Sequence, residues 1–484
     1  MRTSMLGGCA LLLLAACPAS STTYHVAPDS SGDVPNIQAA IDAATGGDEI
    51  VLSDGTFTGD GNWDLDFGTK DLVLRSVSGY EATTIDCGFD GSNGVMHRGM
   101  TLSGGQSLAT RVEGITFQHA WGDQDGGAML CIGVSPVIRS VRVRENRVFR
   151  HGSAIFVQSG GPTIEGCVLE SNFGSESGTA IYARQSWINV QRCMIELNTG
   201  GWGIVDLDGG TIVGCTFRGN RGLSDGGPGN DVHIVGGRAS LLECRFLGRP
   251  VTAVALEPAA QVLIGSCSFE DNQSDTGACI FGSGAATVRN STFRRSWAWI
   301  GGGAICFSGS LLLDHCVFED NASQRGGTVY LSAGDLAVSH CTFARNQTGE
   351  GASAIVIGSG GPVGRVAIDH TILAFGAPYG SGSLSGAFEC GGSPAVLEVS
   401  CADVFGNDGG DWTGCIAGLN GTNGSLSADP LFCDVATGDF SLQANSPCAP
   451  ANTGECGLIG ALGVSCGATA LADRSWGSIK ALYR

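Results

Sequence analysis

The feature that most constrains this chain is a phrase of about 25 residues that recurs from about residue 115 onward. Each copy runs polar–Cys–x–apolar–x–x–Asn, then a short turn, then Gly-Gly-Ala and a second apolar alternation, as in 166–172 and 315–321. Successive apolar anchors are 22 to 30 residues apart. The anchors are Phe117, Val143, Leu169, Ile195, Phe217, Phe246, Phe269, Phe293, Phe318, Phe343 and Leu373. A short unit repeated at a nearly fixed period predicts a solenoid.

The units of this solenoid are short strands. Each period contains runs of four to six residues with strict polar–apolar alternation, separated by glycine, asparagine or serine. A propeller blade needs a longer repeat, and the leucine consensus of leucine-rich repeats is absent. We therefore predict an all-β fold, a parallel β-helix, and we expect right-handed coils because parallel crossovers are almost always right-handed. Asparagines at one coil corner are expected to stack as a hydrogen-bonded column: Asn146, Asn172, Asn198, Asn220, Asn272, Asn321 and Asn346.

The start of the repeat region has the features of a cap. Residues 34–44 have the apolar spacing of a short helix, and Gly46 and Gly47 follow it. A solenoid needs such a cap because its first coil otherwise leaves an open sheet edge. We expect the cap and the coils to span 22–384, with disulfide-bearing C-terminal coils at 385–466. Residues 467–484 are expected to be a polar linker and tail, for which a sorting tag is one interpretation.

Two resemblances support this fold. Residues 24–29, 37–42 and 47–50 resemble the cap of secreted pectin-lyase-like right-handed β-helix proteins. The Gly-Gly-Ala and Phe-x-x-Asn phrases resemble bacterial surface β-helix repeats of the polymorphic outer-membrane type. Together these resemblances cover most of 22–466. They imply an extracellular or outer-cell-surface protein, in a family that includes lyases, hydrolases, esterases and non-enzymatic adhesins.

The first 21 residues predict a secretory signal peptide (1–21). Arg2 precedes a short apolar run, and small residues follow it. Residues 14–17 resemble a bacterial lipobox, which would leave a lipid-modified Cys17, whereas 19–21 resemble an ordinary small-residue cleavage site. Both interpretations stay open, and both predict bacterial export.

Composition excludes some partners. The chain has 46 acidic and 26 basic residues, a net charge of −20. Nucleic acid and anionic membrane surfaces are therefore poor partners, and membrane contact is expected only through a lipid anchor at Cys17. The partner we expect is a polysaccharide or another cell-surface polymer.

The 20 cysteines include two groups with different expected roles. One group occupies a single inward position at the coil period, where we expect small buried hydrophobic side chains in the reduced state: Cys167, Cys193, Cys215, Cys244, Cys267, Cys316 and Cys341. The other group lies in the glycine-rich C-terminal part and is expected to form disulfides: Cys390, Cys401, Cys415, Cys433, Cys448, Cys456 and Cys466. Seven is an odd number, so one of these is free or pairs elsewhere.

Two sets of residues suggest ligands. Asp60, Asn62, Asp64 and Asp66 place oxygen atoms at alternate positions, as calcium loops do, so calcium is the cofactor for which the sequence offers a candidate site. The alternative is a solvated strand face. Trp297 and Trp299 lie two residues apart after Arg294 and Arg295. Aromatic faces beside guanidinium groups suit sugar rings and uronate carboxylates, while the alternative is an apolar staple at a corner.

Three histidines share one coil position. His315, His340 and His370 each precede the inward cysteine or its equivalent, Thr371. Their surroundings, 313–316 and 368–370, resemble the Ile-Asp-His strand of pectate lyases, although the tryptophan before that motif and the Asp-Gly after it are missing. A stacked polar ladder on the solvent face is the structural interpretation. Paired outward carboxylates also occur, but regular repetition produces such pairs by default.

Three classes of function remain open from the sequence. The first choice is a non-catalytic secreted or cell-surface protein that binds or displays extended polymers, because no coil gathers acid, base and electrophile together. The alternative is a polysaccharide lyase or glycoside hydrolase, since the fold offers a long groove. A further alternative is a purely structural surface protein. Whether the chain is an enzyme, and which residues would be catalytic, stays undecided.

Overall fold

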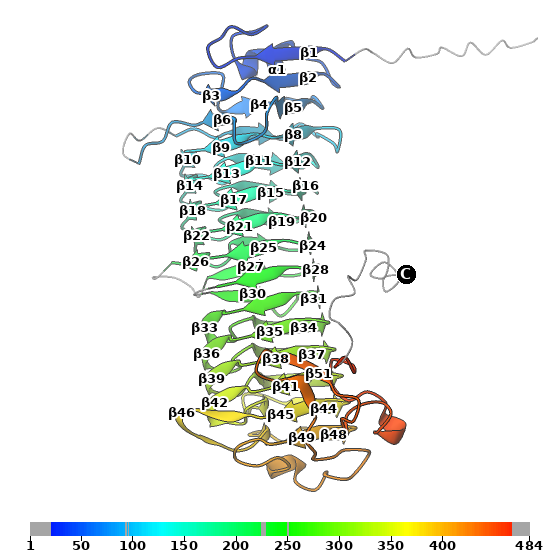
Figure 1. The fold of residues 1–484 in the computed structure, drawn as a ribbon. Helices are drawn as coiled ribbons and strands as arrows, with labels where there is room; N and C mark the ends of the chain where they lie inside the picture. The colour runs from blue at the N-terminus through cyan, green and yellow to red at the C-terminus, as the bar shows by residue number, and fades with distance from the viewer. Residues whose placement is uncertain (1–20, 92–93, 95, 224–228, 249–250, 467–484) are drawn as a thin grey trace, which may run out of the picture.

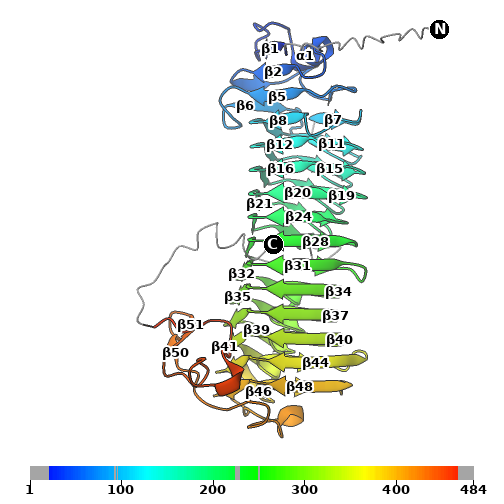
Figure 2. The same ribbon diagram turned by 90° about the vertical axis from the view of Figure 1, so that its right-hand side faces the viewer.

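A rod of stacked coils makes up the molecule, shown in two views in Figures 1 and 2. The computed structural model describes residues 21–466, except 92–93, 95, 224–228 and 249–250. Strands of neighbouring coils pair in parallel, and one sheet contains 14 of them, so this sheet extends over about 62 Å at about 4.8 Å per coil. The prediction of an all-β, right-handed parallel β-helix is confirmed.

A single coil shows how the chain winds. The coil starts with β15 (Ile155–Gln158) and β16 (Thr163–Glu165) in a 25-stranded sheet, which we call the long sheet. It continues with β17 (Val168–Glu170) in the 14-stranded sheet and turns through β18 (Phe173–Gly174) in a small corner sheet. The next coil repeats this order in register.

The strands of the coils fall into four stacked sheets. The 14-stranded sheet consists of β3 (Gly55–Phe57), β6 (Thr83–Asp86), β9 (Thr116–Gln118), β13 (Arg142–Arg144), β17, β21 (Met194–Glu196), β25 (Thr216–Arg218), β29 (Arg245–Leu247), β32 (Ser268–Glu270), β35 (Thr292–Arg294), β38 (Val317–Glu319), β41 (Thr342–Ala344), β45 (Ile372–Ala374) and β49 (Asp403–Phe405). The first corner sheet consists of β10 (Trp121–Gly122), β14 (Arg147–Val148), β18, β22 (Thr199–Gly200) and β26 (Arg221–Gly222). The second corner sheet consists of β33 (Gln273–Thr276), β36 (Trp297–Ile300), β39 (Ala322–Arg325), β42 (Gln347–Gly351) and β46 (Ala377–Leu384).

The long sheet contains the remaining strands of the coils. They are β1 (Thr23–Val26), β2 (Glu49–Leu52), β4 (Leu65–Asp66), β5 (Val73–Ser76), β7 (Met100–Leu102), β8 (Arg111–Glu113), β11 (Met129–Ile132), β12 (Val137–Arg139), β15, β16, β19 (Ile181–Arg184), β20 (Ile188–Gln191), β23 (Val205–Leu207), β24 (Gly210–Val213), β27 (Asn230–Ile234), β28 (Arg238–Leu242), β30 (Thr252–Leu256), β31 (Gln261–Gly265), β34 (Ile280–Arg289), β37 (Ile305–Asp314), β40 (Val329–Ser339), β43 (Ile355–Ile357), β44 (Val363–Asp369), β47 (Phe388–Cys390) and β48 (Val396–Ser400).

The predicted anchors form the core of the 14-stranded sheet. Each anchor aligns with the next in the strand register, from Phe117 to Leu373, and all are buried. From Phe217 to Phe343 the rings stack on one another, with centroids 4.4 to 4.8 Å apart. The coil spacing thus matches the spacing at which flat apolar rings pack, which is why phenylalanine recurs at this position.

The predicted asparagine column is present as two buried runs, 146–220 and 321–346, and Ser296 stands at the corner position between Asn272 and Asn321. The side-chain amide of Asn172 donates to the Asn198 side-chain oxygen at 3.0 Å and to the Val143 carbonyl at 3.0 Å. The same arrangement links Asn321 to Asn346 at 3.1 Å. The column satisfies backbone groups that a corner would otherwise bury without partners.

The glycines of the repeated phrase allow a turn to fold over the sheet. Gly152 has φ +67°, and a Cβ there would lie 2.8 Å from the Phe156 Cβ. Gly178 has φ +68°, and a Cβ added there would lie 2.5 Å from the Tyr182 Cβ. Because the turn lies against them, side chains that point outward from the long sheet, such as Phe156, are buried nevertheless. Glycine is required here for both its positive φ and its missing side chain.

The predicted capping helix is present. The helix α1 (Ile37–Ala43) begins after Asn36, whose side chain accepts from the Ala39 amide at 2.8 Å. Its apolar face, including Ile37 and Ile41, is buried in the core. The helix therefore covers the first coil at the N-terminal end of the rod, visible in Figure 2.

The C-terminal part of the chain is built differently. After β49 the described chain contains two short 3-10 helices, η1 (Gly414–Ile416) and η2 (Gly454–Cys456), and an antiparallel pair, β50 (Phe432–Asp434) and β51 (Asp439–Leu442). Six of the seven cysteines of 385–466 are paired, as Cys390–Cys415, Cys401–Cys456 and Cys433–Cys466, and Cys448 is free. Figure 2 shows this segment folded back along the side of the last coils.

Candidate functional site

Both corner sheets lie on the same long edge of the rod, as the labels β10 to β26 and β33 to β46 in Figure 1 show. In the first corner sheet the register aligns Trp121, Arg147 and Phe173 on successive coils. In the second, Trp297 aligns with Gln273 and Ala322. The corner strands therefore place aromatic side chains at the same corner of the rod on separate coils.

At the first corner sheet these rings are in contact. Phe89 and Trp121 stack with centroids 5.0 Å apart and planes at 7°. Trp121 meets Phe149 edge-on at 6.0 Å. The Arg147 guanidinium lies over the Phe173 ring, 4.5 Å from its centroid, as in a cation–π contact. The rings of Phe89, Trp121 and Phe149 are thus in contact, and the Arg147 guanidinium lies between Phe149 and Phe173.

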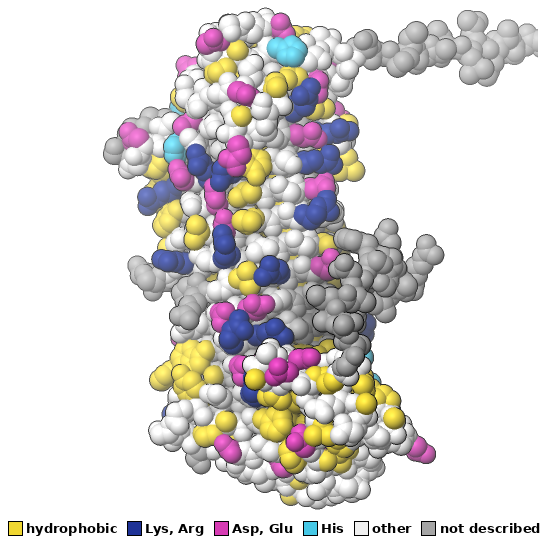
Figure 3. Space-filling model, in the orientation of Figure 1, with side chains coloured by type: hydrophobic (Ala, Val, Ile, Leu, Met, Phe, Trp, Pro, Cys, Tyr) yellow, Lys and Arg dark blue, Asp and Glu magenta, His cyan; other side chains and the backbone are white. Residues whose placement is uncertain are grey.

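At the second corner sheet the two predicted tryptophans lie on the same side. Their ring centroids are 6.0 Å apart, and Ala298 between them points into the core. Trp299 is 53% exposed, while the Trp297 indole N–H is buried and has no acceptor among the described residues. Figure 3 shows hydrophobic side chains gathered on this edge at the level of the second corner sheet.

Together these outward side chains form what we call the aromatic edge. Its members are Phe89, Trp121, Phe149, Phe173, Trp202, Trp297 and Trp299. Trp202 follows β22 and is 53% exposed. From Phe89 to Trp297 the chain advances eight coils in the 14-stranded sheet, which is about 38 Å at about 4.8 Å per coil.

The two arginines predicted to act with the tryptophans already have partners. Arg294 forms an ion pair with Glu319 at 2.9 Å. Arg295 pairs with Asp271 at 3.0 Å. Their positive charge is thus balanced by carboxylates of neighbouring coils, and the structure brings the tryptophans together without leaving a free guanidinium beside them.

Two cavities border the first part of the aromatic edge. One, of about 450 Å³, is lined by Phe89, Asp86, His119 and Glu145. In it the His119 ring lies between two carboxylates, with Nδ1 3.0 Å from Asp86 and Nε2 3.0 Å from Glu145. The other, of about 240 Å³, adjoins Trp121. Sequence reasoning missed His119, because its partners come from coils above and below it.

A second cluster that sequence reasoning missed lies on the outer face of the long sheet. Asp206 is 1% exposed and contacts His233 Nδ1 at 3.2 Å and the Arg184 guanidinium. Burial raises the pKa of Asp206, but its hydrogen bond to His233 and the charges of His233 and Arg184 outweigh burial and leave the pKa below its usual value. Burial lowers the pKa of His233, and its bonds to Asp206 and Glu257 outweigh that effect and raise it. The cluster is a closed ion network.

One signal for this cluster was present in the sequence. The last residue of the Gly-Gly-Ala phrase is apolar or aromatic in many coils, as at Leu130, Phe156 and Tyr182. In register with these side chains stand Asp206 and His233. Many other coils have an apolar or aromatic residue at this position, which a turn covers. The charged residues Asp206 and His233 therefore distinguish their two coils from those.

The four predicted calcium ligands do not converge. Asn62 Oδ1 accepts from the Ile37 amide at 3.1 Å, at the start of α1. Asp64 contacts His97 Nδ1 at 2.6 Å, and Asp66 accepts from the Gly68 amide at 2.9 Å. Asp60, Asp64 and Asp66 do not form a compact ligand group among the described residues. Side chains at alternate positions lie on one side only in a strand. Residues 58–64 form turns and bends, so the four side chains do not point the same way.

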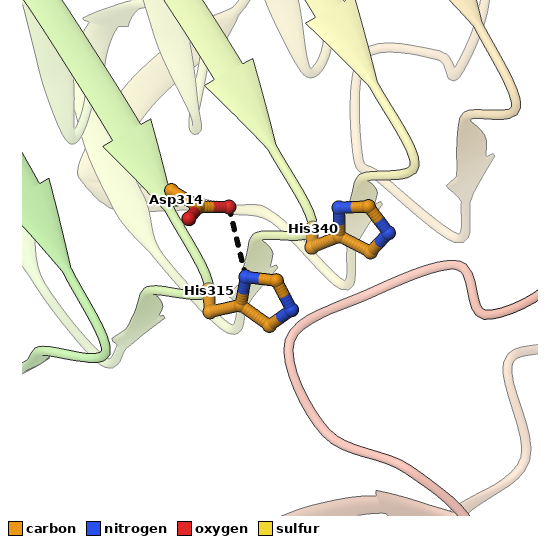
Figure 4. Close-up of side chains that lie close together, drawn as sticks. All are labelled: Asp314, His315 and His340. Carbon is orange, nitrogen blue, oxygen red and sulfur yellow. Dashed lines mark hydrogen bonds and ion pairs between the residues drawn. The ribbon is translucent and has the colours of Figure 1, made fainter. Parts of the chain in front are cut away.

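The three predicted histidines do stack. His315, His340 and His370 lie on successive coils, with parallel rings in contact. His315 is exposed, and the other two are half-buried. Figure 4 shows the first two with Asp314.

The predicted signal peptide with its lipobox at Cys17 and the predicted tail 467–484 lie outside the described residues. In the described part of the chain, no helix has the length and apolar character needed to cross a membrane.

Comparisons with known proteins agree with the fold. The family model of the right-handed β-helix region matches residues 230–374. No curated protein sequence matches the chain. Among solved structures, similar ones include pectate lyase Pel9A, with 14% identity, TM-score 0.30, and 92% of this chain and 97% of that chain covered. The A-module of mannuronan C-5 epimerase AlgE6 from Azotobacter vinelandii has 12% identity and TM-score 0.37, with 76% and 93% covered.

A third structure is the surface adhesin PfbA of Streptococcus pneumoniae, with 11% identity, TM-score 0.28, and 75% of this chain and 86% of that chain covered. At these identities and TM-scores, none of the three bears on a substrate.

Proposed function

We propose that this right-handed parallel β-helix is an exported protein that binds an extended, neutral polysaccharide along its aromatic edge without transforming it. The observation that carries the proposal is that seven aromatic side chains lie on turns that follow strands of the 14-stranded sheet, with ring contacts from Phe89 through Trp121 to Phe149 and between Trp297 and Trp299. A coil spacing of about 4.8 Å is close to the length of one sugar unit in a linear polysaccharide. The aromatic clusters at the two corner sheets are therefore placed to stack on separate sugars of one extended chain.

The charges of the molecule favour a neutral ligand. The net charge is −20, which repels a polyuronate at long range. Arg294 and Arg295, the cations nearest the two tryptophans in the sequence, are paired with carboxylates of the rod. Arg147 faces the Phe173 ring. Because these arginines already have partners, we expect the protein to recognise its ligand by stacking aromatic rings on sugars and not by ion pairs.

Many outward carboxylates also have partners, which supports binding over catalysis. Glu170 pairs with Arg142 at 2.7 Å, and Glu165 pairs with Arg139 at 3.1 Å. Such pairs repeat from coil to coil and neutralise each other. A glycosidase needs two carboxyl groups free to reach one glycosidic bond.

The cysteines support an extracellular compartment. Three disulfides join residues of 390–466, and disulfides of this kind persist in oxidising environments outside the cytoplasm. We therefore place the mature protein outside the cell or on its outer surface, in agreement with the predicted signal peptide.

The proposal is tested by binding of the full mature protein to a panel of soluble neutral and acidic polysaccharides, measured by titration calorimetry. Trp121→Ala and Trp297→Ala, one from each corner sheet, are each expected to weaken binding about fivefold or more, since buried aromatic contacts dominate such interfaces. Trp187→Ala is the matched control. Trp187 is 50% exposed but follows β19, away from the aromatic edge, and its loss should leave affinity unchanged.

Two results would contradict the proposal. Equal effects of Trp187→Ala and Trp121→Ala would show that the edge is not the binding surface. Absence of binding to every polymer would favour the purely structural alternative.

A lyase or hydrolase remains the second candidate, on the strength of one observation. His119 is held between Asp86 and Glu145 in the cavity beside Phe89. An imidazole bonded to carboxylates at both nitrogens is a candidate proton donor. The same panel is therefore assayed for released reducing ends and unsaturated products. Turnover that His119→Gln abolishes would establish the second candidate and overturn the first.

A further inference from the structure

The second corner sheet carries an outward column of residues that begins at Trp299. Ser323 of β39 pairs with Ala298 of β36, so Gln324 occupies the position of Trp299 one coil later. Gly349 of β42 takes the same position on the next coil. The column therefore runs from an indole ring to an amide and then to a position without a side chain.

A second aromatic ring ends this column. Pro378 of β46 pairs with Thr348 of β42, and the register shifts after this pair. Thr348 is buried, so the alternation along the strand places Pro378 on the inner side and Tyr379 on the outer side, where Tyr379 is 38% exposed. From β36 to β46 the corner sheet advances three coils. Trp299 and Tyr379 thus stand about 14 Å apart along the rod, at about 4.8 Å per coil.

Two primary amides lie between these rings. Gln324 is half-buried, and a Cβ at Gly349 would lie 2.5 Å from its Nε2 atom, so the amide reaches over the empty position on the next coil. Gln347 is also half-buried and has alanine on the coils before and after it. Within the described ranges of the chain, neither side-chain amide has a hydrogen-bond partner. Both amides are therefore available to a ligand.

We propose that Trp299, Gln324, Gln347 and Tyr379 form one oligosaccharide site, the corner site, which binds about four units of a neutral glycan whose adjacent hydroxyl groups are free. Trp299 and Tyr379 stack on the two end sugars, and the two glutamines bind hydroxyls of the sugars between them. This assignment rests on the polysaccharide binding proposed above and gives that binding a length and a chemical preference.

The spacing of the two rings sets the length of the ligand. One sugar unit of an extended polysaccharide is close in length to one coil, about 4.8 Å. Rings three coils apart therefore face the first and the fourth sugar of one chain, where their flat apolar faces can stack. Gln324 and Gln347 stand on the two coils between and face the second and third sugars.

A primary amide suits hydroxyl groups that are neighbours on one sugar. Its oxygen accepts one hydrogen bond while its NH₂ group donates another, and of two adjacent hydroxyls one can donate and the other accept. An O-acetylated sugar has lost its hydroxyl donor, which leaves the amide oxygen without a partner once the ligand covers it. The two glutamines should therefore prefer unsubstituted sugars.

Charges around the corner site disfavour an acidic ligand. Asp275 stands beside Trp299 on the preceding coil, is exposed, and forms no ion pair with another described residue. Arg325, which follows Gln324, is paired with Glu350 at 3.1 Å. A uronate chain would thus meet an unpaired carboxylate, while the guanidinium beside the site is already neutralised.

The experiment titrates the full mature protein by calorimetry with β-1,4-linked oligosaccharides of glucose, mannose and xylose, two to six units long, and with their O-acetylated forms. We expect affinity to rise with length up to four units and then to level off. The O-acetylated tetrasaccharide should bind about tenfold more weakly than the unsubstituted one, because two amides lose a partner.

Three variants assign this profile to the corner site. Tyr379→Ala should remove the gain in affinity that the fourth unit brings. Gln324→Met and Gln347→Met keep the length of the side chain and remove its hydrogen bonds. Each should weaken binding of the unsubstituted tetrasaccharide about fivefold, the effect of one neutral hydrogen bond, and leave binding of the O-acetylated form unchanged.

Gln158→Met is the matched control. Gln158 is an exposed glutamine at the end of β15 in the long sheet, and its amide likewise has no partner among the residues that the structure describes. Its replacement should leave every affinity unchanged. Circular dichroism checks that each variant is folded, and either glutamine variant tests the site should the other fail to fold.

The outcomes separate this assignment from the proposed function. Affinity that keeps rising to six units, or that none of the three variants changes, overturns the corner site. If polymer binding still responds to Trp121→Ala in that case, the proposed function stands. Absence of binding to every oligosaccharide and every polymer overturns both.

Discussion

Cysteine serves two different purposes in two regions of this molecule. In the rod, the column from Cys167 to Cys341 is buried and unpaired. In the C-terminal region, residues 385–466, six of seven cysteines form disulfides. The coils of the rod pair strand by strand in the long sheet and the 14-stranded sheet, whereas the C-terminal region has few strands. The contrast shows that coil-to-coil packing stabilises one region and covalent links stabilise the other.

Geometry explains why neighbouring thiols in the rod stay apart. Side chains on parallel strands in register point in the same direction, which suits packing but not a disulfide. The Cys193 sulfur instead accepts a hydrogen bond from the Cys167 backbone amide, at 3.4 Å. Burial, with the contact to Cys316, raises the pKa of the Cys341 thiol and so disfavours its reactive thiolate.

The largest effect is expected from a change in the packed rod. Phe293 is fully buried between the rings of Phe269 and Phe318, at 4.7 and 4.6 Å. Phe293→Ala leaves a cavity in this stack and should lower the free energy of unfolding by about 3–5 kcal/mol. Urea denaturation followed by circular dichroism measures it. Phe281→Ala, an exposed ring on the long sheet, is the control and should have little effect.

The next effect is the loss of a covalent link. Replacing Cys401 and Cys456 together by serine removes the disulfide that closes a separation of 55 residues. The C-terminal region should lose about 2–4 kcal/mol of stability, while the rod should keep its own. Hydrogen exchange by mass spectrometry resolves the two regions, with faster exchange expected in 396–461. Faster exchange throughout 116–374 would show that the regions are not independent.

A smaller effect concerns pH in the C-terminal region. Burial raises the pKa of the Asp403 carboxyl to about 7, against 3.8 in the unfolded chain. Between these values the folded state holds a proton that the unfolded state has released, so stability falls as pH rises from 4 to 7. From pH 5 to 6 the loss should be about 1 kcal/mol, at most the 1.36 kcal/mol that one proton permits. Asp403→Asn should flatten this slope, measured by exchange in 396–461.

The rod offers a reference for that measurement. Burial likewise raises the pKa of Asp231 to about 7, and Asp231 accepts from the Asn220 amide at 2.8 Å. The pH dependence of exchange in the rod should therefore persist in Asp403→Asn. A slope that disappears from both regions would mean that Asp403 is not acting locally.

The smallest effect is expected from the charge ladders on the rod surface. Arg139 is paired with Glu165 at 3.1 Å and with Glu113 at 3.7 Å, and its side chain is 48% exposed. Arg139→Ala should lower the free energy of unfolding by only about 0.2–1 kcal/mol, because water screens such pairs. Urea denaturation at low and high salt measures it. A loss above about 2 kcal/mol would mean that surface charge, and not packing, stabilises the rod.

The fold was predictable because it repeats. The anchors from Phe117 to Leu373 all lie in one sheet and point into the core. They recur once per coil, so when one anchor faces the core, the equivalent residues of the other coils face it too. Asparagine columns and the two roles of cysteine follow from the same period. Each of these features depends on a residue and its equivalent one coil away, a relation visible in the sequence.

The site was less predictable because it depends on departures from the repeat. Asn62 bonds the amide of Ile37, 25 residues earlier, and so serves the cap rather than a metal. Arg294 meets Glu319 across one coil, a pairing set by side-chain direction. The line of Phe89, Trp121 and Phe149 forms because three turns of different sequence end at one edge. The Asn62 contact and the aromatic contacts have no periodic signature, and the Arg294–Glu319 pair, although its members are register partners one coil apart, does not mark a ligand site.

The folded-back C-terminal segment has a mechanical consequence. It is attached to three successive coils, through the Ala461 amide to the Thr342 hydroxyl, the Gly460 amide to the His370 carbonyl, and Cys456 to Cys401. Tension applied at that end of the chain is shared among three coils at once. Under such tension the last coil should not unfold before the two coils next to it. A rod held at its C-terminal end should therefore transmit force along its axis without losing its last coil.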